Sequence, residues 1–364
     1  MVTNARKGEL LAVRRWTGVN PVSLIGLAVV ALLIVWLAVN LEKTPADFFQ
    51  AFLIGITRGS LYALIALGYT LVYGILELIN FAHGDLFMLG GMIAMTLIGS
   101  DLFGLHAGDS ALHVWPAILA VLGITMIGCG LINVTVERIA YRPLRGAPRL
   151  VPLITAIAAS FILQNIGIAT KGSDYVTLNS GGGRSGAADF LPQGNVFTFG
   201  KNGYYAWADL IVLLITAPVL IGLVWLVQRT KQGKAMRATA QDREAAAMMG
   251  IDVNRTISFT FLIAGSLAGA AGLVYAMYFT SVRFDQGFQL GLFAFTAAVL
   301  GGIGNLPGAV LGGLTIGIVE AFNNTLSWHS PGGDWKQSIV FAILIMILVF
   351  RPEGLLGERT PEGG

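Results

Sequence analysis

Ten apolar runs, separated by shorter polar stretches, dominate the chain. They cover residues 22–40, 48–75, 85–100, 114–137, 150–170, 208–228, 256–280, 288–303, 308–325 and 337–350. An α-helix needs about 20 apolar residues to cross a bilayer, and several of these runs have that length. The shorter runs are typical of broken or re-entrant helices, which membranes tolerate inside a helix bundle. The pattern predicts an all-α polytopic membrane protein with about ten transmembrane segments.

Composition supports this fold class. Of the 364 residues, 55% are hydrophobic and only 12% are charged, whereas soluble domains carry about 25% charged residues. A soluble fold of this size could not cover its surface with so few charges. The 47 glycines favour close helix crossings. The single cysteine, Cys129, has no partner for an intrachain disulfide.

Basic residues in the loops predict the orientation, because cytoplasmic loops of membrane proteins are enriched in Lys and Arg. With the N-terminus placed in the cytoplasm, four of the inside segments hold four, four, six and two basic residues. All the outside loops together hold six. We therefore expect both termini in the cytoplasm, an extracytoplasmic loop at 171–207 and a cytoplasmic loop at 229–255.

The stretch ELINFAHGDL, residues 77–86, places three ionisable side chains between two apolar runs. On the predicted topology it is a short cytoplasmic turn. Asn80 and Asp85 are typical of turns and helix starts, and the glycine at 84 permits a bend. A capped hairpin therefore explains the polarity without catalytic chemistry.

The cytoplasmic loop 229–255 reads RTKQGKAMRATAQDREAAAMMGIDVNR. Residues 234–249 are almost entirely good helix formers, and Gly250 stands where a helix would end. The charges and a small apolar patch lie at Lys234, Arg237, Asp242, Arg243, Glu244, Ala245, Ala246, Met248 and Met249. A short helix of this kind fits either a groove on a protein partner or the layer of lipid headgroups.

Catalytic signatures are absent from the sequence. It has no G-x-x-x-x-G-K-[ST] phosphate loop, no H-E-x-x-H or C-x-x-C metal motif and no G-x-S-x-G elbow. Four histidines, at 83, 106, 113 and 329, are scattered without ligand spacing. We therefore expect a chain that is not an enzyme. Any uphill transport would draw its energy from an ion gradient or from another subunit.

A glycine-rich break lies between the eighth and ninth apolar runs. It comprises Gly301, Gly302, Gly304, Asn305 and Pro307. Such a break forms either a transporter binding site or gate, or a tight hairpin between two spans. Glu320, near the outer end of the ninth run, either lines a path or marks a helix end. Arg58, in the second run, is expected to extend its charge to the membrane interface.

Glycine pairs four residues apart occur at Gly55/Gly59, Gly265/Gly269, Gly308/Gly312 and Gly313/Gly317. This spacing favours close helix crossings, and we interpret it as packing. In addition, GSLYALIALGYTLVYG at 59–74 weakly resembles GSLAGAAGLVYAMYFT at 265–280. The predicted topology runs the two stretches in opposite directions, which fits an inverted repeat.

Three stretches together resemble branched-chain amino acid permeases of the LivH type, which are subunits of bacterial ABC importers. They are GSLYALIALGYTLVYGILELINFAHGD at 59–85, GKAMRATAQDREAAAMMGID at 233–252 and FTAAVLGGIGNLPGAVLGGLTIGIVEA at 295–321. The EAA and following glycine at 244–250 resemble the signature of the loop that couples such permeases to their ATPases. The later Ile-x-Leu-Pro part of that signature is absent.

The resemblance also implies a division of the chain. Similarity runs from about residue 48 to 357, so residues 1–45, a basic tail with the first apolar run, look like an addition to the family pattern. The permease domain would then cover 46–351, followed by a cytoplasmic tail at 352–364.

Partners follow from the same resemblance. Such a permease pairs with a homologous permease, two cytoplasmic ABC ATPase subunits and an extracytoplasmic substrate-binding protein, within the lipid bilayer of a bacterial inner membrane. It binds no cofactor, metal or nucleic acid, because ATP and magnesium bind to the ATPase subunits. The expected substrate is a branched-chain or other neutral amino acid. Related permeases associated with urea and short amides keep those substrates open.

The resemblance assigns ATPase coupling to Lys234, Arg237, Asp242, Arg243, Glu244, Ala245, Ala246, Met249 and Gly250. We expect a translocation pathway or gate at Asn80, His83, Asp85, Gly301, Gly302, Gly304, Asn305, Pro307 and Glu320. Two other classes compete with the importer. An ion-coupled secondary transporter predicts paired carboxylates within the spans, and a passive channel has no need of the loop helix.

Overall fold

The computed structural model describes residues 21–100, 102–103, 105, 111–148, 150–177, 194–199, 203–326, 328, 330–351 and 353–357. The predicted basic tail at 1–20, the NSGGGRSG stretch at 179–186, the histidines at 106 and 329 and the last residues of the C-terminal tail lie outside the described residues.

Each of the ten predicted apolar runs forms one helix. These helices are α2 (Pro21–Lys43), α3 (Pro45–Leu76), α4 (Ala82–Ile98), α5 (Ala111–Val136), α6 (Leu150–Lys171), α7 (Trp207–Arg229), α10 (Val253–Phe279), α11 (Gln286–Gly301), α12 (Leu306–Thr325) and α13 (Lys336–Phe350). Seven helices in the described part are long and apolar enough to cross a membrane. The prediction of an all-α polytopic membrane protein is confirmed.

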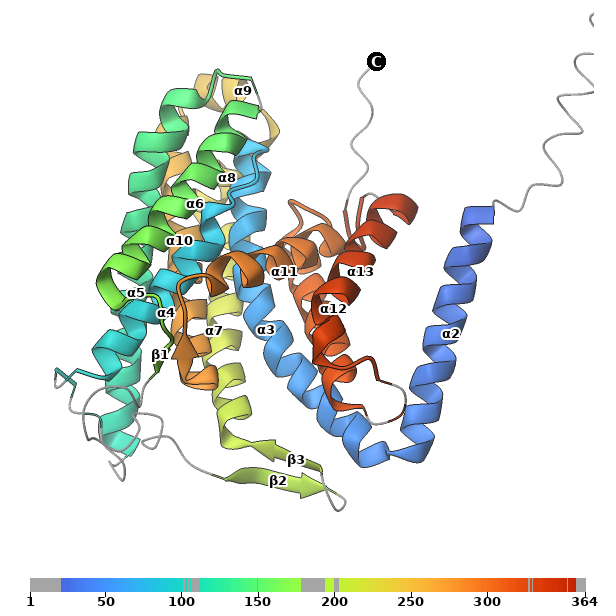
Figure 1. Ribbon diagram of the computed structural model, residues 1–364. Coiled ribbons are helices and arrows are strands. Elements are labelled where there is room, and N and C mark those ends of the chain that lie inside the picture. The colour runs from blue at the N-terminus through green and yellow to red at the C-terminus, as the bar shows by residue number, and fades with distance from the viewer. Residues whose placement is uncertain are drawn as a thin grey trace, which may run out of the picture.

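The remaining elements are short. They are η1 (Glu137–Tyr141), η2 (Arg142–Leu144), α8 (Lys231–Gln241), α9 (Arg243–Met248), η4 (Gly333–Trp335), and the strands β1 (Val176–Thr177), β2 (Asn195–Phe199), β3 (Gly203–Ala206) and β4 (Ser281–Val282). Strand β1 pairs with β4, and β2 pairs with β3. Figure 1 shows α9 at one end of the bundle and the β2–β3 hairpin at the opposite end, with α2 standing at the edge.

Helices α3 and α10 form the centre of the bundle. Their apolar windows are 89% and 72% buried, whereas the window that includes α13 is 6% buried. Small residues make this burial possible. Gly59 of α3 lies against Gly313 and Leu314 of α12, and Gly269 of α10 lies against Thr125 of α5. The interpretation of the glycine pairs as sites of close helix packing is confirmed.

The two central helices are arranged as an inverted pair. They run in opposite directions (Figure 1), and each ends in a left-handed residue, Glu77 with φ 55° and Thr280 with φ 53°. Each is followed by a short helix, α4 or α11, and then by a longer one. The first set of three helices is thus α3, α4 and α5, and the second is α10, α11 and α12. Helix α3 packs against α12 of the second set, and α10 packs against α5 of the first. This exchange supports the inverted repeat inferred from 59–74 and 265–280.

Helix α4 begins inside the bundle. It has 17 residues, and His83 in its first turn lies against Gly68. Gly68 precedes the end of α3 by eight residues, which correspond to about 12 Å along a helix. The chain therefore turns back beside α3 before α4 starts. Helix α11, with 16 residues, meets α4 there, because Gly287 contacts Gly84.

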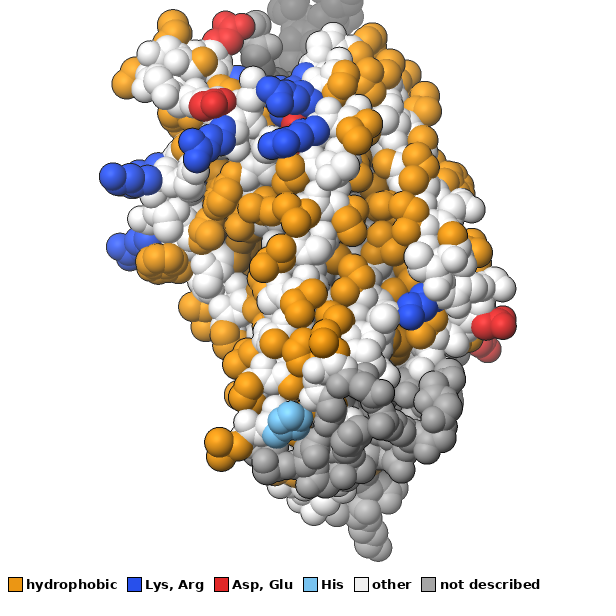
Figure 2. All heavy atoms as spheres, turned by 90° about the vertical axis from the view of Figure 1, so that its left-hand side faces the viewer, with side chains coloured by type: hydrophobic (Ala, Val, Ile, Leu, Met, Phe, Trp, Pro, Cys, Tyr) orange, Lys and Arg blue, Asp and Glu red, His pale blue; other side chains and the backbone are white. Residues whose placement is uncertain are grey.

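The surface shows the division expected of a membrane protein. In Figure 2, hydrophobic side chains cover a broad middle band, and most Lys and Arg side chains of this face gather toward the end that carries α9. At the opposite end, Tyr205 of β3 is hydrogen-bonded to Thr57 of α3 at 3.0 Å. On this face of the molecule, most charged side chains thus lie outside the apolar band.

Candidate functional site

The predicted loop helix is two helices rather than one. Helix α8 starts at the N-cap Thr230, whose Oγ1 accepts a hydrogen bond from the amide of Gly233 at 3.0 Å. It ends at Gln241, because Asp242 is extended, with φ −155° and ψ 114°. The Asp242 carboxylate then caps α9, accepting from the amides of Glu244 at 2.8 Å and Ala245 at 3.0 Å. The single helix predicted over 234–249 was therefore wrong at Asp242, a residue type that favours N-caps.

Helix α9 and the residue that follows it project Glu244, Met248 and Met249 outward. Met248 and Met249 are each 82% exposed, whereas Ala246 is 4% exposed and rests on the bundle. Glu244 is also exposed. Gly250 has φ +81°, so it ends the helix where the sequence predicted. A protruding turn with a carboxylate and two methionines offers a contact surface to a partner.

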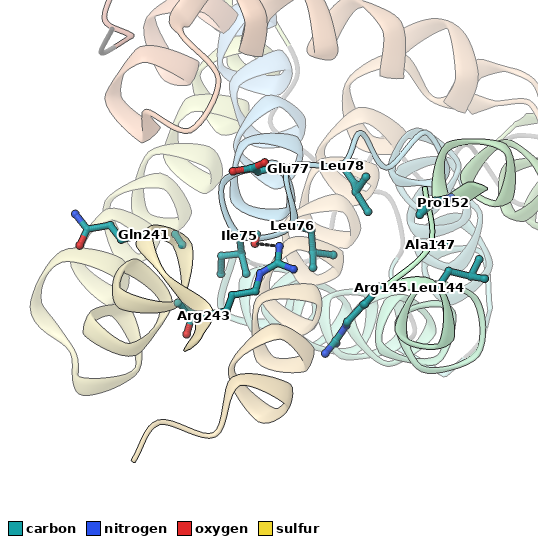
Figure 3. Close-up of a pocket in the computed structure, with 12 residues that line it drawn as sticks. Ile75, Leu76, Glu77, Leu78, Leu144, Arg145, Ala147, Pro152, Gln241 and Arg243 are labelled. Atoms are coloured by element: carbon teal, nitrogen blue, oxygen red, sulfur yellow. Dashed lines mark hydrogen bonds between the residues drawn. The ribbon is translucent and has the colours of Figure 1, made fainter. Parts of the chain in front are cut away.

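Other residues of the predicted coupling set have different surroundings. Lys234 and Arg237 lie on α8 and are exposed, and the Arg237 guanidinium donates to the carbonyl of Val227. Arg243 points inward. Its Nη2 donates to the carbonyl of Ile75 at 2.7 Å, at the end of α3 (Figure 3). Arg243 therefore anchors α9 to α3, while Glu244 stays exposed.

A cavity of about 290 Å³ lies beside this anchor. Figure 3 shows Arg243, Arg145 and Glu77 at its wall. Arg145 is held by the fully buried Glu137 carboxylate and donates to Asn254 Oδ1 at 2.5 Å. Desolvation lowers the pKa of Arg145, and the neighbouring Glu137 opposes that shift. These contacts fix the loop after α5 to the start of α10.

Asn80 and residues 82–86 of the ELINFAHGDL stretch are buried, whereas Glu77 is exposed. Asn80, His83 and Asp85 are 2%, 0% and 0% exposed, and the N-cap of α4 is Phe81, with no side-chain cap. The predicted turn between the second and third runs is present at residues 77–81, but the capping by Asn80 and Asp85 was a wrong prediction. The segment fits into the bundle because Gly84 lies against Gly287 and Gly291 of α11, where a side chain would collide with backbone.

Buried partners reach Asn80 Oδ1 and the Asp85 carboxylate, whereas Asn80 Nδ2 and both ring nitrogens of His83 are buried without a hydrogen-bond partner among the described residues. Tyr141 donates its hydroxyl hydrogen to Asn80 Oδ1 at 2.7 Å. Asp85 accepts hydrogen bonds from the Ser160 hydroxyl and, at 3.2 Å, from Gln164 Nε2. The His83 ring packs edge-on against Tyr69, with ring centroids 4.9 Å apart. Sequence reasoning missed Ser160, Gln164 and Tyr141. Polar side chains within apolar runs were the available signal.

The glycine-rich break is a tight hairpin. Gly302 and Gly304 have φ +105° and +93°, which glycine adopts readily. Asn305 Oδ1 accepts from the Gly308 amide at 3.0 Å to start α12, and Pro307 lies in its first turn. Residues after α13 cover the turn. The amides of Leu355 and Leu356 donate to Leu300 and Gly301 at 2.8 and 3.0 Å. The hairpin interpretation holds for Gly301 and its neighbours.

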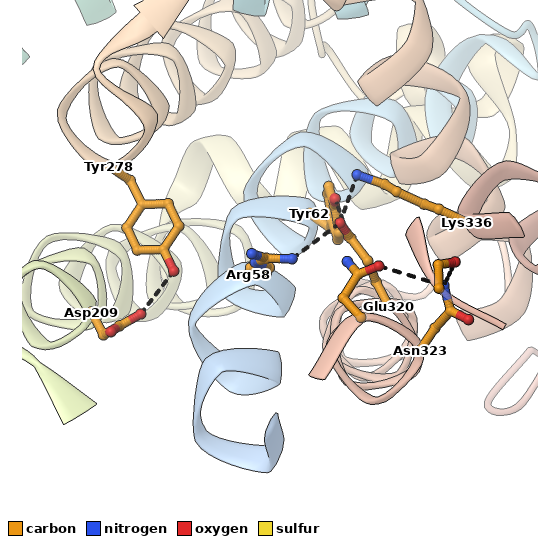
Figure 4. Close-up of polar contacts among 9 residues, drawn as sticks. Arg58, Tyr62, Asp209, Tyr278, Glu320, Asn323 and Lys336 are labelled. Atoms are coloured by element: carbon orange, nitrogen blue, oxygen red, sulfur yellow. Dashed lines mark hydrogen bonds and ion pairs between the residues drawn. The ribbon is translucent and has the colours of Figure 1, made fainter. Parts of the chain in front are cut away.

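Glu320 lies in a charged cluster with Arg58 and Lys336 (Figure 4). Its side chain is 3% exposed and lies 2.6 Å from Lys336 Nζ and 3.4 Å from Arg58 Nη1. Tyr62 also donates to it. Arg58 thus pairs inside the bundle rather than extending to the interface as predicted. Lys336, at the start of α13, was missed because the sequence reads as a loop there.

The predicted pathway residues do not form one site. Arg58 and Ile75 lie at opposite parts of α3, and their separation in sequence corresponds to about 25 Å of helix. The Glu320 cluster joins α3, α12 and α13, while Asp85 joins α4 to α6. Among the described residues, no group of three or more His, Cys, Asp and Glu side chains could hold a metal ion.

Known proteins are similar in sequence to this chain over most of its length. The family model described as the permease component of branched-chain amino acid transport systems matches residues 51–348. The high-affinity branched-chain amino acid transport permease protein BraD of Pseudomonas aeruginosa is 40% identical over 86% of this chain and 97% of its own. LivH of Escherichia coli K12, described in the same way, is 35% identical over the same shares.

A solved structure, PsaBC from Streptococcus pneumoniae in complex with Fab, also matches the chain. The TM-score is 0.39 and the identity 17%, over 88% of this chain and 97% of that one. This likeness is too weak to carry an argument.

Proposed function

Because this chain belongs to the family of permease components of branched-chain amino acid transport systems, we propose that it is the membrane subunit of an ATP-driven importer. Its substrate is a branched-chain or other neutral amino acid. The identities of 40% and 35% to permeases named for branched-chain amino acids support this choice of substrate.

The exposed helix α9 is the observation that carries the coupling role. An amphipathic helix that presents Met side chains suits insertion into a groove on a protein partner. In this proposal the groove belongs to a cytoplasmic ATPase subunit, and Glu244, Met248 and Met249 enter it. The headgroup layer is a poorer environment for α9, because the carboxylate of Glu244 is exposed beside the two methionines.

The remaining parts of the importer follow. A homologous permease, two ATPase subunits carrying ATP and magnesium, and an extracytoplasmic binding protein complete it in a bacterial inner membrane. The end with α9 faces the cytoplasm, together with both termini. Residues 1–45, with α2, are an addition before the permease domain, an arrangement supported by a family match that begins at residue 51.

The competing classes have less support. Urea or amide import fits the family pattern but not the names of the relatives. A secondary transporter would use carboxylates paired within the spans. Glu320 instead pairs with two cations, and Asp85 accepts from neutral donors. A passive channel would have no function for the exposed helix α9.

Co-purification and uptake test the proposal together. The protein is solubilised from its native membrane, and two ATP-binding subunits are expected to travel with it. After reconstitution with the cognate binding protein, labelled leucine should be transported only when ATP is present on the side of the vesicle membrane that carries the ATPase subunits. Alanine and urea serve as competing substrates. Leucine uptake driven by an ion gradient, without ATPase subunits, would overturn the proposal.

A further inference from the structure

A groove opens on the side of the bundle between α6 and α11, with a volume of about 360 Å³. Small-molecule sites in proteins have roughly 300–1,000 Å³. The apolar wall includes Ile157, Phe161 and Phe288, and the polar wall includes Ser160, Gln164 and Gln289. The size and mixed lining suit a small ligand that has an apolar body and one polar end.

The carboxyl group of Asp85 stands directly behind this wall. It is fully buried, and its two oxygens accept from Ser160 and Gln164, both of which line the groove. Both partners are neutral. A carboxylate at membrane depth is costly, and such residues usually serve a function. The placement of Asp85 behind a groove is therefore unlike a structural ion pair such as Glu320 with Lys336.

The hydrogen bonds to Asp85 decide what the groove offers a ligand. A serine hydroxyl has one hydrogen, and that of Ser160 points to Asp85, so its lone pairs remain for the groove. Gln164 uses Nε2 toward Asp85 and keeps its carbonyl oxygen as an acceptor. Asp285, also in the lining, adds a carboxylate that pairs with Arg283 at 2.8 Å. The polar wall is thus rich in acceptors.

We propose that this groove binds the transported amino acid by its α-ammonium group, with the aliphatic side chain against Phe161, Ile157 and Phe288. The ammonium group supplies the donors that Ser160 and Gln164 accept, and the negative charge of Asp85 stabilises it. The inference rests on the proposed importer function and adds the residues that meet the substrate. Lipid tails would leave these acceptors unpaired.

Cysteine labelling tests the groove in the assembled importer in vesicles. Phe161→Cys places a thiol in the groove, while Ile162→Cys places one at the same depth, about 100° around α6. The native side chains are equally exposed, 59% and 60%. The native chain is the blank, because its one cysteine, Cys129, is fully buried. The probe is a charged, water-soluble methanethiosulfonate.

We expect the thiol at 161 to react at least about tenfold faster than that at 162, because a thiolate forms in water and not against lipid. Leucine and isoamylamine, each at saturating concentration, should slow the reaction at 161. Isocaproate, which keeps the aliphatic body but lacks the ammonium group, should not. Asp85→Asn should abolish protection by isoamylamine. The asparagine side chain would direct its NH₂ donor toward Ser160 or Gln164.

Equal reactivity at 161 and 162, absence of protection by leucine, or protection by isocaproate in place of isoamylamine would each overturn the inference. ATP-driven leucine uptake is measured in the same vesicles. Uptake by the native importer together with any of those labelling results rejects the groove alone. Absence of ATP-driven uptake rejects the proposed function itself.

Discussion

The guanidinium of Arg243 in α9 donates a hydrogen bond to the backbone carbonyl of Ile75, 2.7 Å away in the last turn of α3. The last carbonyls of a helix have no partner within it, so this bond joins an exposed helix to the most buried of the seven candidate spans. Asp85 follows Ile75 by ten residues. Movement of α9 thus has a short route to the buried segment behind the groove.

Arg243→Ala should uncouple ATP hydrolysis from uptake. A hydrogen bond from a charged donor contributes about 1.5–3 kcal/mol, so uptake should fall about tenfold or more. ATP hydrolysis by the complex should continue. Both rates are measured in proteoliposomes. Arg255→Ala is the control, because Arg255 is exposed on α10 near the same end. Equal uptake by the two variants would show that the contact with Ile75 does not transmit movement.

Glu244→Arg should abolish ATP-driven uptake while membrane insertion and folding stay intact. The side chain is exposed, so the substitution reverses a surface charge without disturbing packing, and the ATPase subunits should no longer co-purify. Glu42→Arg makes the same change on an exposed residue of α2, at the end of the bundle away from α9 (Figure 1). Normal uptake by Glu244→Arg would refute docking through α9.

Gly287→Ala should separate α4 from α11. A Cβ at this position would lie 2.7 Å from the Gly84 carbonyl oxygen and 2.8 Å from Asp85 Oδ1. Overpacking of this kind costs about 1–3 kcal/mol, which should lower the melting temperature in detergent and reduce uptake. Gly123→Ala in α5 meets open space and should leave both unchanged. A Gly287→Ala protein as stable as Gly123→Ala would contradict the close contact.

Glu320→Gln should destabilise the fold by about 1.5–3 kcal/mol, because it removes the buried carboxylate that pairs with two half-buried cations, Arg58 and Lys336. Thermal unfolding in detergent measures the loss. The double variant Glu320→Gln with Lys336→Met removes one of the two cations that contact Glu320 and should recover part of the stability. No recovery would indicate that Lys336 is stabilised by other groups.

Much of the architecture could be predicted, because the thickness of the bilayer requires long apolar runs, and such runs can be recognised in any sequence. All ten runs became helices. The glycine pairs also predicted the close helix crossings correctly, because helices whose backbones touch have no room for side chains, as at Gly59 and Gly313. The start of α9 was missed because a row of good helix formers outweighed one capping residue, Asp242.

The buried polar segment could not be predicted in the same way. Asn80, His83 and Asp85 look like surface residues in sequence, since polarity normally implies contact with water. Their partners Tyr141, Ser160 and Gln164 come from η1 and α6, and only the fold brings them together. The inward direction of Arg243 likewise depends on where α3 ends.

The short segment after α13 that covers the α11–α12 hairpin has a consequence for how the protein is made and handled. Leu355 and Leu356 supply the partners of carbonyls at Leu300 and Gly301, so the turn stays incomplete until more than fifty further residues have been synthesised. A reporter or affinity tag should therefore be attached beyond Gly357. A tag that replaces this segment would leave the hairpin open to water and to proteases.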